Sequence, residues 1–472
     1  MMKKKRLMIL TVTSCLLLMA GPVFLILCGF FLPEQYGDTF VGELKEKYAL
    51  LKEAEGKKIV LIGGSGVAFG YDCSFIKEIF PEYEVVNFGM YGGLGTKAMM
   101  DLAAQSIHKD DIVILSPEQE KQSLSCYFGA EYMWQAADGA FHLLREVKRE
   151  NRGEMAGSFP DFAAEKLRYV IKGEKPAPEG VYSKNSFDAY GNIESQLCSY
   201  NIMPEGYDKN TPVKFEEDIP EERFVDYMNN FAREMEKKGA LVWYRFCPVN
   251  GKAVASQEAV EDYYLLLQKK IVFPIIGDPR ESVMEAEWFY DTNFHLNSGG
   301  RLVNTVQTVR DMKAMLGRTE AVASPYVPLP EPKQERMEEG NNEDAVYFTW
   351  KEENGRAVLT GLTEEGKRKE VLTIPVSFGG LPVKTLGAKV FAGNERIERI
   401  IIQKGMEFIE DGAFQSCSSL KAVKVENDNP SEIRPGQKLL EGTGALIHVN
   451  QRALSDYRTN YFWSLYAGRI TY

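Results

Sequence analysis

A run of apolar residues leads directly into a glycine-flanked serine at Lys57-Lys58-Ile59-Val60-Leu61-Ile62-Gly63-Gly64-Ser65-Gly66. The apolar part is short and continuous, which is typical of a strand buried on both faces of a parallel sheet. Two similar runs, Glu84–Phe88 and Asp111–Leu115, also end in small or polar residues, and helix-like stretches at 73–80 and 96–107 lie between the three. This alternation predicts an α/β domain with a parallel sheet covered on both faces, and a ligand site beyond the carboxyl ends of its strands.

The middle of the chain is less regular. Helices are indicated at 131–149 and 162–171, and a polar stretch rich in Gly, Asn and Pro follows at 173–212. That stretch is either an insertion over the site or a mobile loop. The α/β pattern then resumes with a helix at 221–238, a strand at 240–246, a helix at 256–270, a strand at 273–276 and a closing helix at 298–316.

The N-terminus carries a targeting signal. Four basic residues, Lys3–Arg6, precede an uncharged run of 26 residues from Leu7 to Leu32. As a helix this run would be about 39 Å long, more than the ~30 Å of a bilayer core. A cleaved signal peptide is the alternative, but its apolar part is shorter and Cys28–Pro33 offers no small-residue cleavage site. The sequence therefore predicts an uncleaved anchor with a cytoplasmic N-terminus and the bulk of the protein outside, followed by an amphipathic juxtamembrane helix within 34–56.

The composition limits the classes of protein and of functional site that are possible. The 472 residues allow about three domains, and a net charge of −11 argues against a nucleic-acid partner, which needs a basic surface. Seven Cys form no C-x-x-C pair and are too sparse for a disulfide framework. No metal and no cofactor is predicted. Any catalytic histidine is one of only four, namely His108, His142, His295 and His448.

The C-terminal part contains an internal repeat. Leu386–Phe391 aligns with Ile409–Phe414 at an offset of 23, and the same offset relates Ile400 to Val423 and Asn394 to Cys417. This period is typical of leucine-rich repeats, whose neighbours must stack to bury an apolar edge. The segment 346–472 resembles the BspA-like leucine-rich repeat of bacterial surface antigens, with a capping helix at its end. The resemblance implies a binding or adhesion module that brings no catalytic residues.

Three glycine- or histidine-containing segments predict an active site. Ser65 follows the first strand in a loop that exposes its hydroxyl, although a phosphate-binding loop or a plain turn are alternatives. The cluster Asn87–Gly95 follows the second strand and offers backbone donors for an oxyanion, or simply a tight turn. A serine nucleophile needs a base and an orienting carboxylate. Of the four histidines, only His295 combines a nearby carboxylate, Asp291, with a preceding strand end.

The order of these segments resembles the SGNH hydrolase superfamily over about 56–316. The likeness is to the membrane-anchored branch that includes the teichoic acid D-alanyl transfer and alginate O-acetylation proteins. It implies a flavodoxin-like three-layer domain in which Ser65 is the nucleophile, His295 the base, Asp291 its orienting carboxylate, and Gly89 or Gly93 the oxyanion glycine.

The chain departs from the SGNH pattern at three places. Gly64 replaces the Asp before the serine, and Ser116-Pro117-Glu118 lacks the Asn of the third block, for which Asn250 is a candidate substitute. Asp291 precedes His295 by four residues instead of three, so that Thr292 occupies the usual position of the carboxylate.

Together these features predict a single-pass plasma-membrane protein of the bacterial cell surface. It would be a serine esterase or O-acyltransferase acting on acyl esters of cell-wall or extracellular polysaccharide, and its relatives imply a multi-pass membrane acyltransferase as partner. The alternative is a non-catalytic SGNH-like protein that presents the repeats for adhesion or assembly. The expected organisation is an anchor at 1–33, a juxtamembrane helix at 34–56, the SGNH-like domain at 57–316, a Pro-rich and acidic linker at 317–345 and the repeat domain at 346–472.

Overall fold

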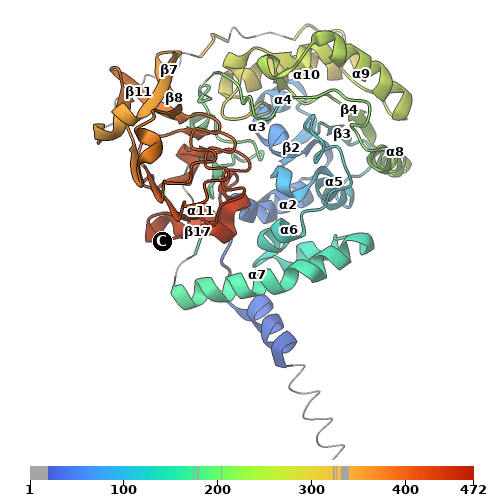
Figure 1. The fold of residues 1–472 in the computed structure, drawn as a ribbon. Helices are drawn as coiled ribbons and strands as arrows, with labels where there is room; N and C mark the ends of the chain where they lie inside the picture. Colours follow the sequence, from blue (N-terminus) through green and yellow to red (C-terminus); the bar gives the residue numbers. More distant parts are fainter. Residues whose placement is uncertain are drawn as a thin grey trace, which may run out of the picture.

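The computed structural model describes residues 20–472, except 174, 177, 179, 204, 323, 324, 326 and 331–339. Half of the predicted membrane span, residues 7–19, and much of the predicted linker lie outside the described residues. Residues 20–31 are helical and project from the body beneath α7 (Arg152–Lys172) (Figure 1). Within the described part of the chain, no helix combines the length and the apolar character needed to cross a membrane.

The first domain is built on a parallel sheet, as the sequence predicts. Its strands lie in the order β2-β1-β3-β4. In this doubly wound order, β2 lies on one side of β1 and β3 on the other, which places a switch point between β1 and β3. The predicted strand at 273–276 is reduced to one parallel bridge between Ile275 and Tyr244. The strands span Lys57–Gly63 (β1), Tyr83–Gly89 (β2), Ile112–Leu115 (β3) and Leu241–Tyr244 (β4).

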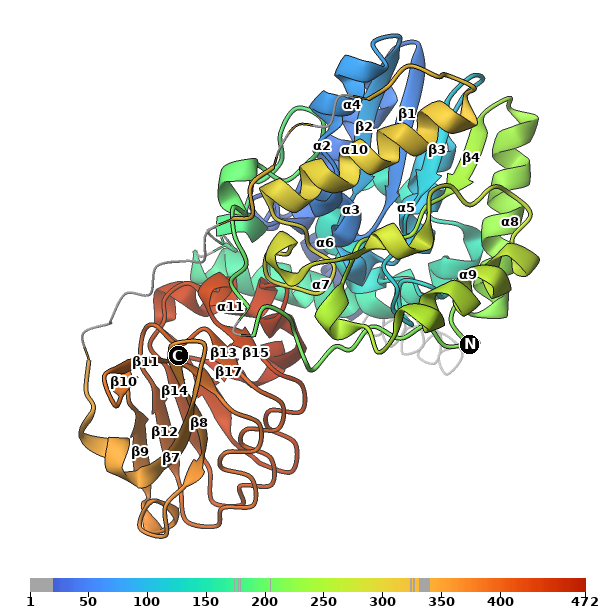
Figure 2. The same ribbon diagram turned by 90° about the horizontal axis from the view of Figure 1, so that it is seen from above.

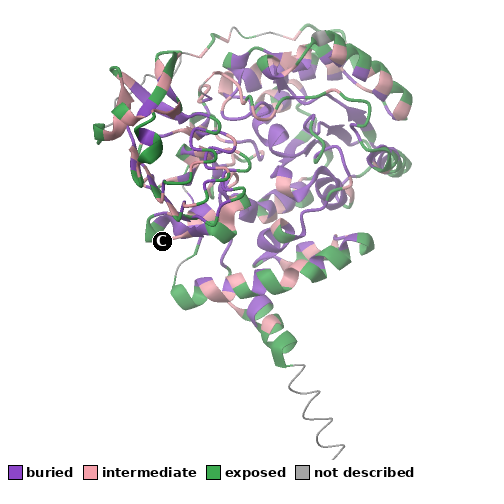
Figure 3. Cartoon of the chain, viewed as in Figure 1, coloured by how far each residue is buried: buried purple, intermediate pink, exposed green. Residues whose placement is uncertain are grey.

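Helices cover both faces of this sheet (Figure 2). Alternate side chains of β1 show the division: Val60 and Ile62 enter one apolar cluster, whereas Ile59 and Leu61 enter another. The first cluster is closed by α2 (Leu44–Glu53), α5 (Thr96–Ala104) and α8 (Glu222–Lys237), and the second by α4 (Cys73–Ile79) and α10 (Ser298–Met315). The four strands are buried apart from Lys57, Glu84 and Leu241, while the outer faces of the helices are exposed (Figure 3).

Several predicted elements differ in extent. The helix expected at 131–149 is a short α6 (Ala130–Ala137) followed by a 3-10 turn at Phe141–Arg145. It ends where Gly139 adopts a φ of +81°, a conformation that other residues rarely adopt. The helix expected at 162–171 begins earlier, at Arg152. The segment 257–270 forms α9 (Gln257–Lys270) as expected.

Two segments with uncertain roles in the sequence belong to the α/β domain. Helix α2 lies in the predicted juxtamembrane segment, but Leu44 and Leu51 are fully buried in the domain core. The polar insertion at 173–212 covers the carboxyl ends of the first two strands. The backbone N–H of Asn87 donates to the Tyr190 carbonyl (2.9 Å), and the N–H of Ile193 donates to the Ala68 carbonyl (3.1 Å). These contacts agree with the interpretation of the stretch as an insertion over the strand ends.

The C-terminal domain is a short solenoid of two facing sheets around one apolar cluster. The predicted offset of 23 appears as strand register, since Ile400 pairs with Val423 and Leu386 pairs with Ile409. One sheet has β9 (Val371–Ile374), β12 (Arg399–Ile402), β14 (Ala422–Val425), β16 (Leu446–His448) and β17 (Ile470–Thr471). The other has β7 (Phe348–Glu353), β8 (Arg356–Leu362), β10 (Ser377–Phe378), β11 (Leu381–Leu386), β13 (Phe408–Ile409) and β15 (Arg434–Pro435).

The end of the solenoid is closed by α11 (Leu454–Thr459) and the 3-10 segment Trp463–Arg469. The Trp463 side chain is 1% exposed, and its indole N–H donates to the Ile433 carbonyl (2.6 Å). The cap, here residues 451–472, is thereby fixed to the repeats. It also faces the α/β domain, where Tyr132 and Ser464 bring their hydroxyl oxygens to 3.3 Å.

Candidate active site

Ser65 lies at the sheet's switch point. It is the first residue of α3 (Ser65–Gly70), directly after β1, and is 2% exposed. The glycine before it leaves room for a buried carboxylate: a Cβ on Gly64 would lie 2.4 Å from Oε1 of Glu118 and would displace it from its hydrogen bond with the N–H of Gly66. Glu118 follows β3, the strand on the other side of the switch point, so the two strand ends meet here.

A hairpin-like loop positions His295. The N–H of Tyr290 donates to the His295 carbonyl (2.8 Å), and Phe289 forms an antiparallel bridge with Leu296. Thr292 closes the loop from inside, because its hydroxyl oxygen accepts the N–H groups of Phe294 (3.1 Å) and His295 (3.0 Å). Thr292 thus has a structural role in the loop, and the loop brings Asp291 beside His295 across a spacing of four residues.

The three predicted catalytic side chains form one chain of hydrogen bonds. Ser65 Oγ lies 2.8 Å from Nε2 of His295, and Nδ1 of His295 lies 2.8 Å from Oδ1 of Asp291. An ionised carboxylate can only accept, so Nδ1 carries the proton and Nε2 is left to accept from the serine hydroxyl. All three side chains are buried, at 2%, 1% and 5% exposure respectively. The structure therefore brings together the side chains predicted as nucleophile, base and orienting acceptor, in the order that acyl transfer requires.

Two aromatic residues that the sequence did not indicate fix this array. The Tyr182 hydroxyl donates to Oδ2 of Asp291 (2.5 Å), and burial together with the charge of Asp291 holds the pKa of Tyr182 well above its ordinary value. The Tyr182 hydroxyl therefore remains a donor. The Phe69 ring stacks on the His295 ring at 4.1 Å with an interplanar angle of 2°. Ring stacking and hydrogen bonding together restrict the imidazole to one orientation.

The predicted oxyanion residues are less well placed. The N–H of Gly89 donates to Oδ1 of Asn87 (3.0 Å), and the Asn250 amide donates to the Gly206 carbonyl (2.8 Å). Asn250 also caps a 3-10 turn by accepting from the N–H of Lys252 (3.1 Å), and it does not line the pocket. Local hydrogen bonds therefore engage both groups, and an oxyanion would have to displace the present acceptors to bind them. Gly93 does line the pocket.

Two carboxyl groups lie close to the serine. The N–H of Gly66 donates to Oε1 of Glu118 (2.6 Å), while Oε2 of Glu118 is buried without a hydrogen-bond partner among the described residues. Glu120 is an exposed residue whose carboxyl lies in the pocket, and shielding by the pocket walls together with the charge of Glu118 raises its pKa to about 7. Nowhere in the described part of the chain do three or more His, Cys, Asp or Glu side chains form a group that could hold a metal ion.

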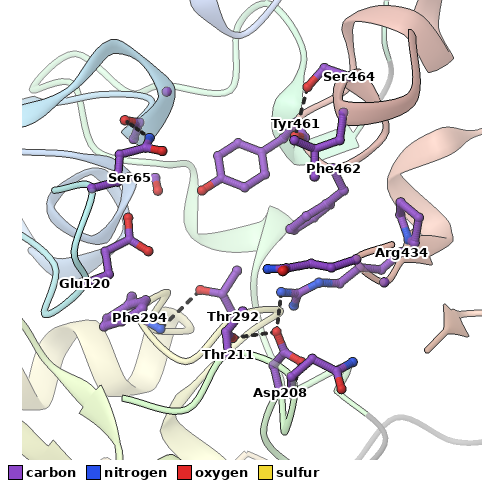
Figure 4. A pocket seen from close by; sticks show the side chains of 18 of the residues that line it. Ser65, Glu120, Asp208, Thr211, Thr292, Phe294, Arg434, Tyr461, Phe462 and Ser464 are labelled. Atoms are coloured by element: carbon purple, nitrogen blue, oxygen red, sulfur yellow. Dashed lines mark hydrogen bonds and ion pairs between the residues drawn. The ribbon is translucent and has the colours of Figure 1, made fainter. Parts of the chain in front are cut away.

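Both domains line the pocket in front of Ser65, which has a volume of about 390 Å³. The repeat domain contributes Arg434, Tyr461 and Phe462, and in Figure 4 the Tyr461 hydroxyl points toward Ser65. Arg434 pairs with Asp208 (2.6 Å) and donates to the Asp291 carbonyl. The repeat domain therefore contacts the loop that carries the histidine.

Most of these additional residues carry no signal in the amino-acid sequence. Tyr182 lies in the irregular insertion, and Tyr461 lies in a segment identified only as a cap. Their contacts span 109 residues (Tyr182 to Asp291) and 370 residues (Tyr91 to Tyr461). Glu118 belongs to the segment 116–118, which the sequence marks by its missing Asn. Its hydrogen bond with Gly66 depends on how the two strand ends meet, so it could not be predicted.

No protein-family model matches the chain, and no curated protein matches it. Among solved structures, a leucine rich cell surface protein from Faecalibacterium prausnitzii is similar at 21% identity and a TM-score of 0.17, over 22% of this chain and 31% of that one. The T. pallidum Leucine Rich Repeat protein is similar at 14% identity and a TM-score of 0.17, over 22% of this chain and 69% of that one. The C-terminal domain is a leucine-rich repeat domain on the strength of its own strand register.

Proposed function

We propose that the protein is a surface-anchored serine esterase or O-acyltransferase of the SGNH type, acting on acyl esters of cell-wall or extracellular polysaccharide. The observation that carries the proposal is the hydrogen-bonded chain from Ser65 through His295 to Asp291 at the switch point of a doubly wound sheet. The SGNH likeness and the basic, then apolar N-terminus support the fold family and the location at the outer face of the membrane.

The reaction would begin at Ser65. As its Oγ attacks the ester carbonyl carbon, His295 takes the serine proton on Nε2 and Asp291 stabilises the imidazolium through Nδ1–H. The intermediate collapses when the bond to the leaving oxygen breaks, and that oxygen receives the proton from Nε2. Water or a glycan hydroxyl then attacks the acyl-enzyme by the same route, which gives hydrolysis or transfer respectively.

The test is turnover of a chromogenic acetyl ester by the full-length chain. Ser65→Ala should abolish turnover, whereas Ser116→Ala should retain it, because Ser116 is buried at the end of β3 and does not line the pocket. The melting temperature of each variant verifies folding. Equal turnover by Ser65→Ala and the wild type would overturn the proposal.

A second candidate, a non-catalytic protein that presents repeats, is favoured by one observation. The carboxylate of Glu118 occupies the N–H of Gly66, the backbone donor next to the nucleophile. This N–H is commonly part of the oxyanion hole, and a carboxylate there would repel an oxyanion. A folded wild type that neither turns over esters nor reacts covalently with a fluorophosphonate would favour this candidate.

A further inference from the structure

The site needs a hydrogen-bond donor for the oxyanion that forms at Ser65. Two of the donors expected there are engaged elsewhere, because Gly89 binds Asn87 and Asn250 binds Gly206. The N–H of Gly66, next to the nucleophile, binds Glu118, whereas Gly93 lines the pocket. Buried donors that already have a partner add little to transition-state stabilisation, since the existing bond must break first. The question is which other group faces the serine.

Tyr461 is that group, and it comes from the repeat domain. Its hydroxyl points toward Ser65 in Figure 4 and lies within hydrogen-bonding reach of the serine hydroxyl. The Tyr461 ring centroid lies 6.3 Å from that of His295, so the phenol shares the pocket with the base.

The phenol is held in place by rings of the α/β domain. Tyr91 meets it edge-on at 4.5 Å, and Tyr182 stacks on it at 5.5 Å. The Tyr91 hydroxyl also donates to the Tyr461 carbonyl (3.3 Å). Two residues along the chain, Trp463 is buried in the repeat domain, and this anchors the segment 461–463 to the solenoid. Tyr461 is thus positioned before any ligand enters, as an oxyanion donor must be.

The Tyr461 hydroxyl also stays protonated. Burial, followed by the charges of Glu120 and Glu118, raises the pKa of Tyr461 above its ordinary value. It is therefore a donor across the physiological pH range.

We propose that Tyr461 is a catalytic residue whose hydroxyl donates a hydrogen bond to the substrate's carbonyl oxygen, so that the active site is complete only when the leucine-rich repeat domain is docked. This inference rests on the proposed esterase or acyltransferase function. When Ser65 Oγ forms its bond to the carbonyl carbon, the π electron pair moves to the oxygen, and the Tyr461 O–H stabilises that charge without giving up its proton. The repeat domain is then part of the enzyme's site and not a separate adhesion module.

The test compares Tyr461→Phe with the wild type in the full-length chain. The variant keeps the ring and its stacking and removes only the hydroxyl. Tyr466→Phe is the matched control, since it removes a phenol hydroxyl from the same cap, where that hydroxyl donates to the Gly436 carbonyl (2.5 Å). Both are assayed for kcat and KM on a chromogenic ester and for the rate of covalent labelling by a fluorophosphonate, whose phosphoryl oxygen would occupy the same position.

We expect Tyr461→Phe to lower kcat about 10²–10³-fold with little change in KM, and to slow labelling to a similar degree. Tyr466→Phe should change neither by more than about twofold, and the melting temperatures establish that both variants are folded. If the fluorophosphonate labels the wild type and Tyr461→Phe equally fast, this inference alone is overturned. A folded wild type that neither labels nor turns over ester overturns the proposed function and this inference with it.

Discussion

Replacing Asp291 with Asn should impair His295 through the tautomer that the imidazole adopts. In the wild type, Oδ1 of Asp291 accepts from Nδ1–H (2.8 Å) while Oδ2 accepts from the Tyr182 hydroxyl (2.5 Å). An asparagine has only one oxygen for these two donors. The Tyr182 hydroxyl, which remains protonated, will take that oxygen, so the Asn NH₂ group faces Nδ1 and forces the proton onto Nε2.

The size of the effect follows from losing the base. A histidine with its proton on Nε2 cannot accept from Ser65, and the comparable change in serine proteases costs about 10⁴-fold in kcat. We expect Asp291→Asn to lower kcat about 10³–10⁴-fold, equivalent to about 4–5.5 kcal/mol of transition-state stabilisation, with KM nearly unchanged.

A second substitution makes the reasoning specific to this structure. Tyr182→Phe alone should cost about tenfold, because one hydrogen bond to a carboxylate is lost. Combined with Asp291→Asn, it frees the asparagine to turn its oxygen toward Nδ1, so the double variant should recover at least tenfold over Asp291→Asn. The assay is steady-state ester turnover with melting temperatures as the folding control. A loss below tenfold in Asp291→Asn, or a double variant no more active than it, would refute the tautomer argument.

Three further predictions concern the surroundings of the site. Arg434→Met removes the ion pair with Asp208, so it should lower kcat/KM about tenfold by weakening domain docking and speed amide exchange around Tyr461; unchanged exchange would contradict this. Because the pKa of Glu120 is raised from 4.5 to about 7, its proton stabilises the fold fully below about pH 4.5, and that stabilisation is lost as pH rises through about 7. Glu120→Gln should therefore melt increasingly above the wild type from pH 5 to pH 8, and a constant difference would argue against the raised pKa. Gly64→Ala places a Cβ 2.4 Å from Glu118 and should cost about 1–3 kcal/mol in unfolding free energy, whereas Gly153→Ala in helix α7 meets open space and should cost nothing; equal stability of the two variants would contradict the close approach.

Local and periodic features of the fold were predictable from the sequence. The apolar run of β1 continues without alternation because both faces of the strand are buried, and that pattern alone predicts a parallel sheet. The offset of 23 was predictable for a similar reason, since stacked repeats place equivalent residues in register, as the Phe391 and Phe414 rings show at 5.6 Å.

Contacts between distant parts of the chain could not be predicted in this way. The pairing of His295 with Ser65 was inferred because only four histidines were available. The chain has 23 tyrosines, so their number does not single out Tyr182 or Tyr461. The hydrogen bonds that engage the donors of Gly89 and Asn250 could not be predicted either, because they depend on side-chain geometry that residue spacing does not encode.

The most direct test of the account is to locate a fluorophosphonate adduct on the full-length protein by mass spectrometry. The predicted result is a single adduct on Ser65, formed with loss of fluoride, that is absent from folded His295→Ala because the serine then lacks its base. An adduct at another residue, or equal labelling of Ser65 with and without His295, would contradict the assignment of Ser65 and His295 as nucleophile and base.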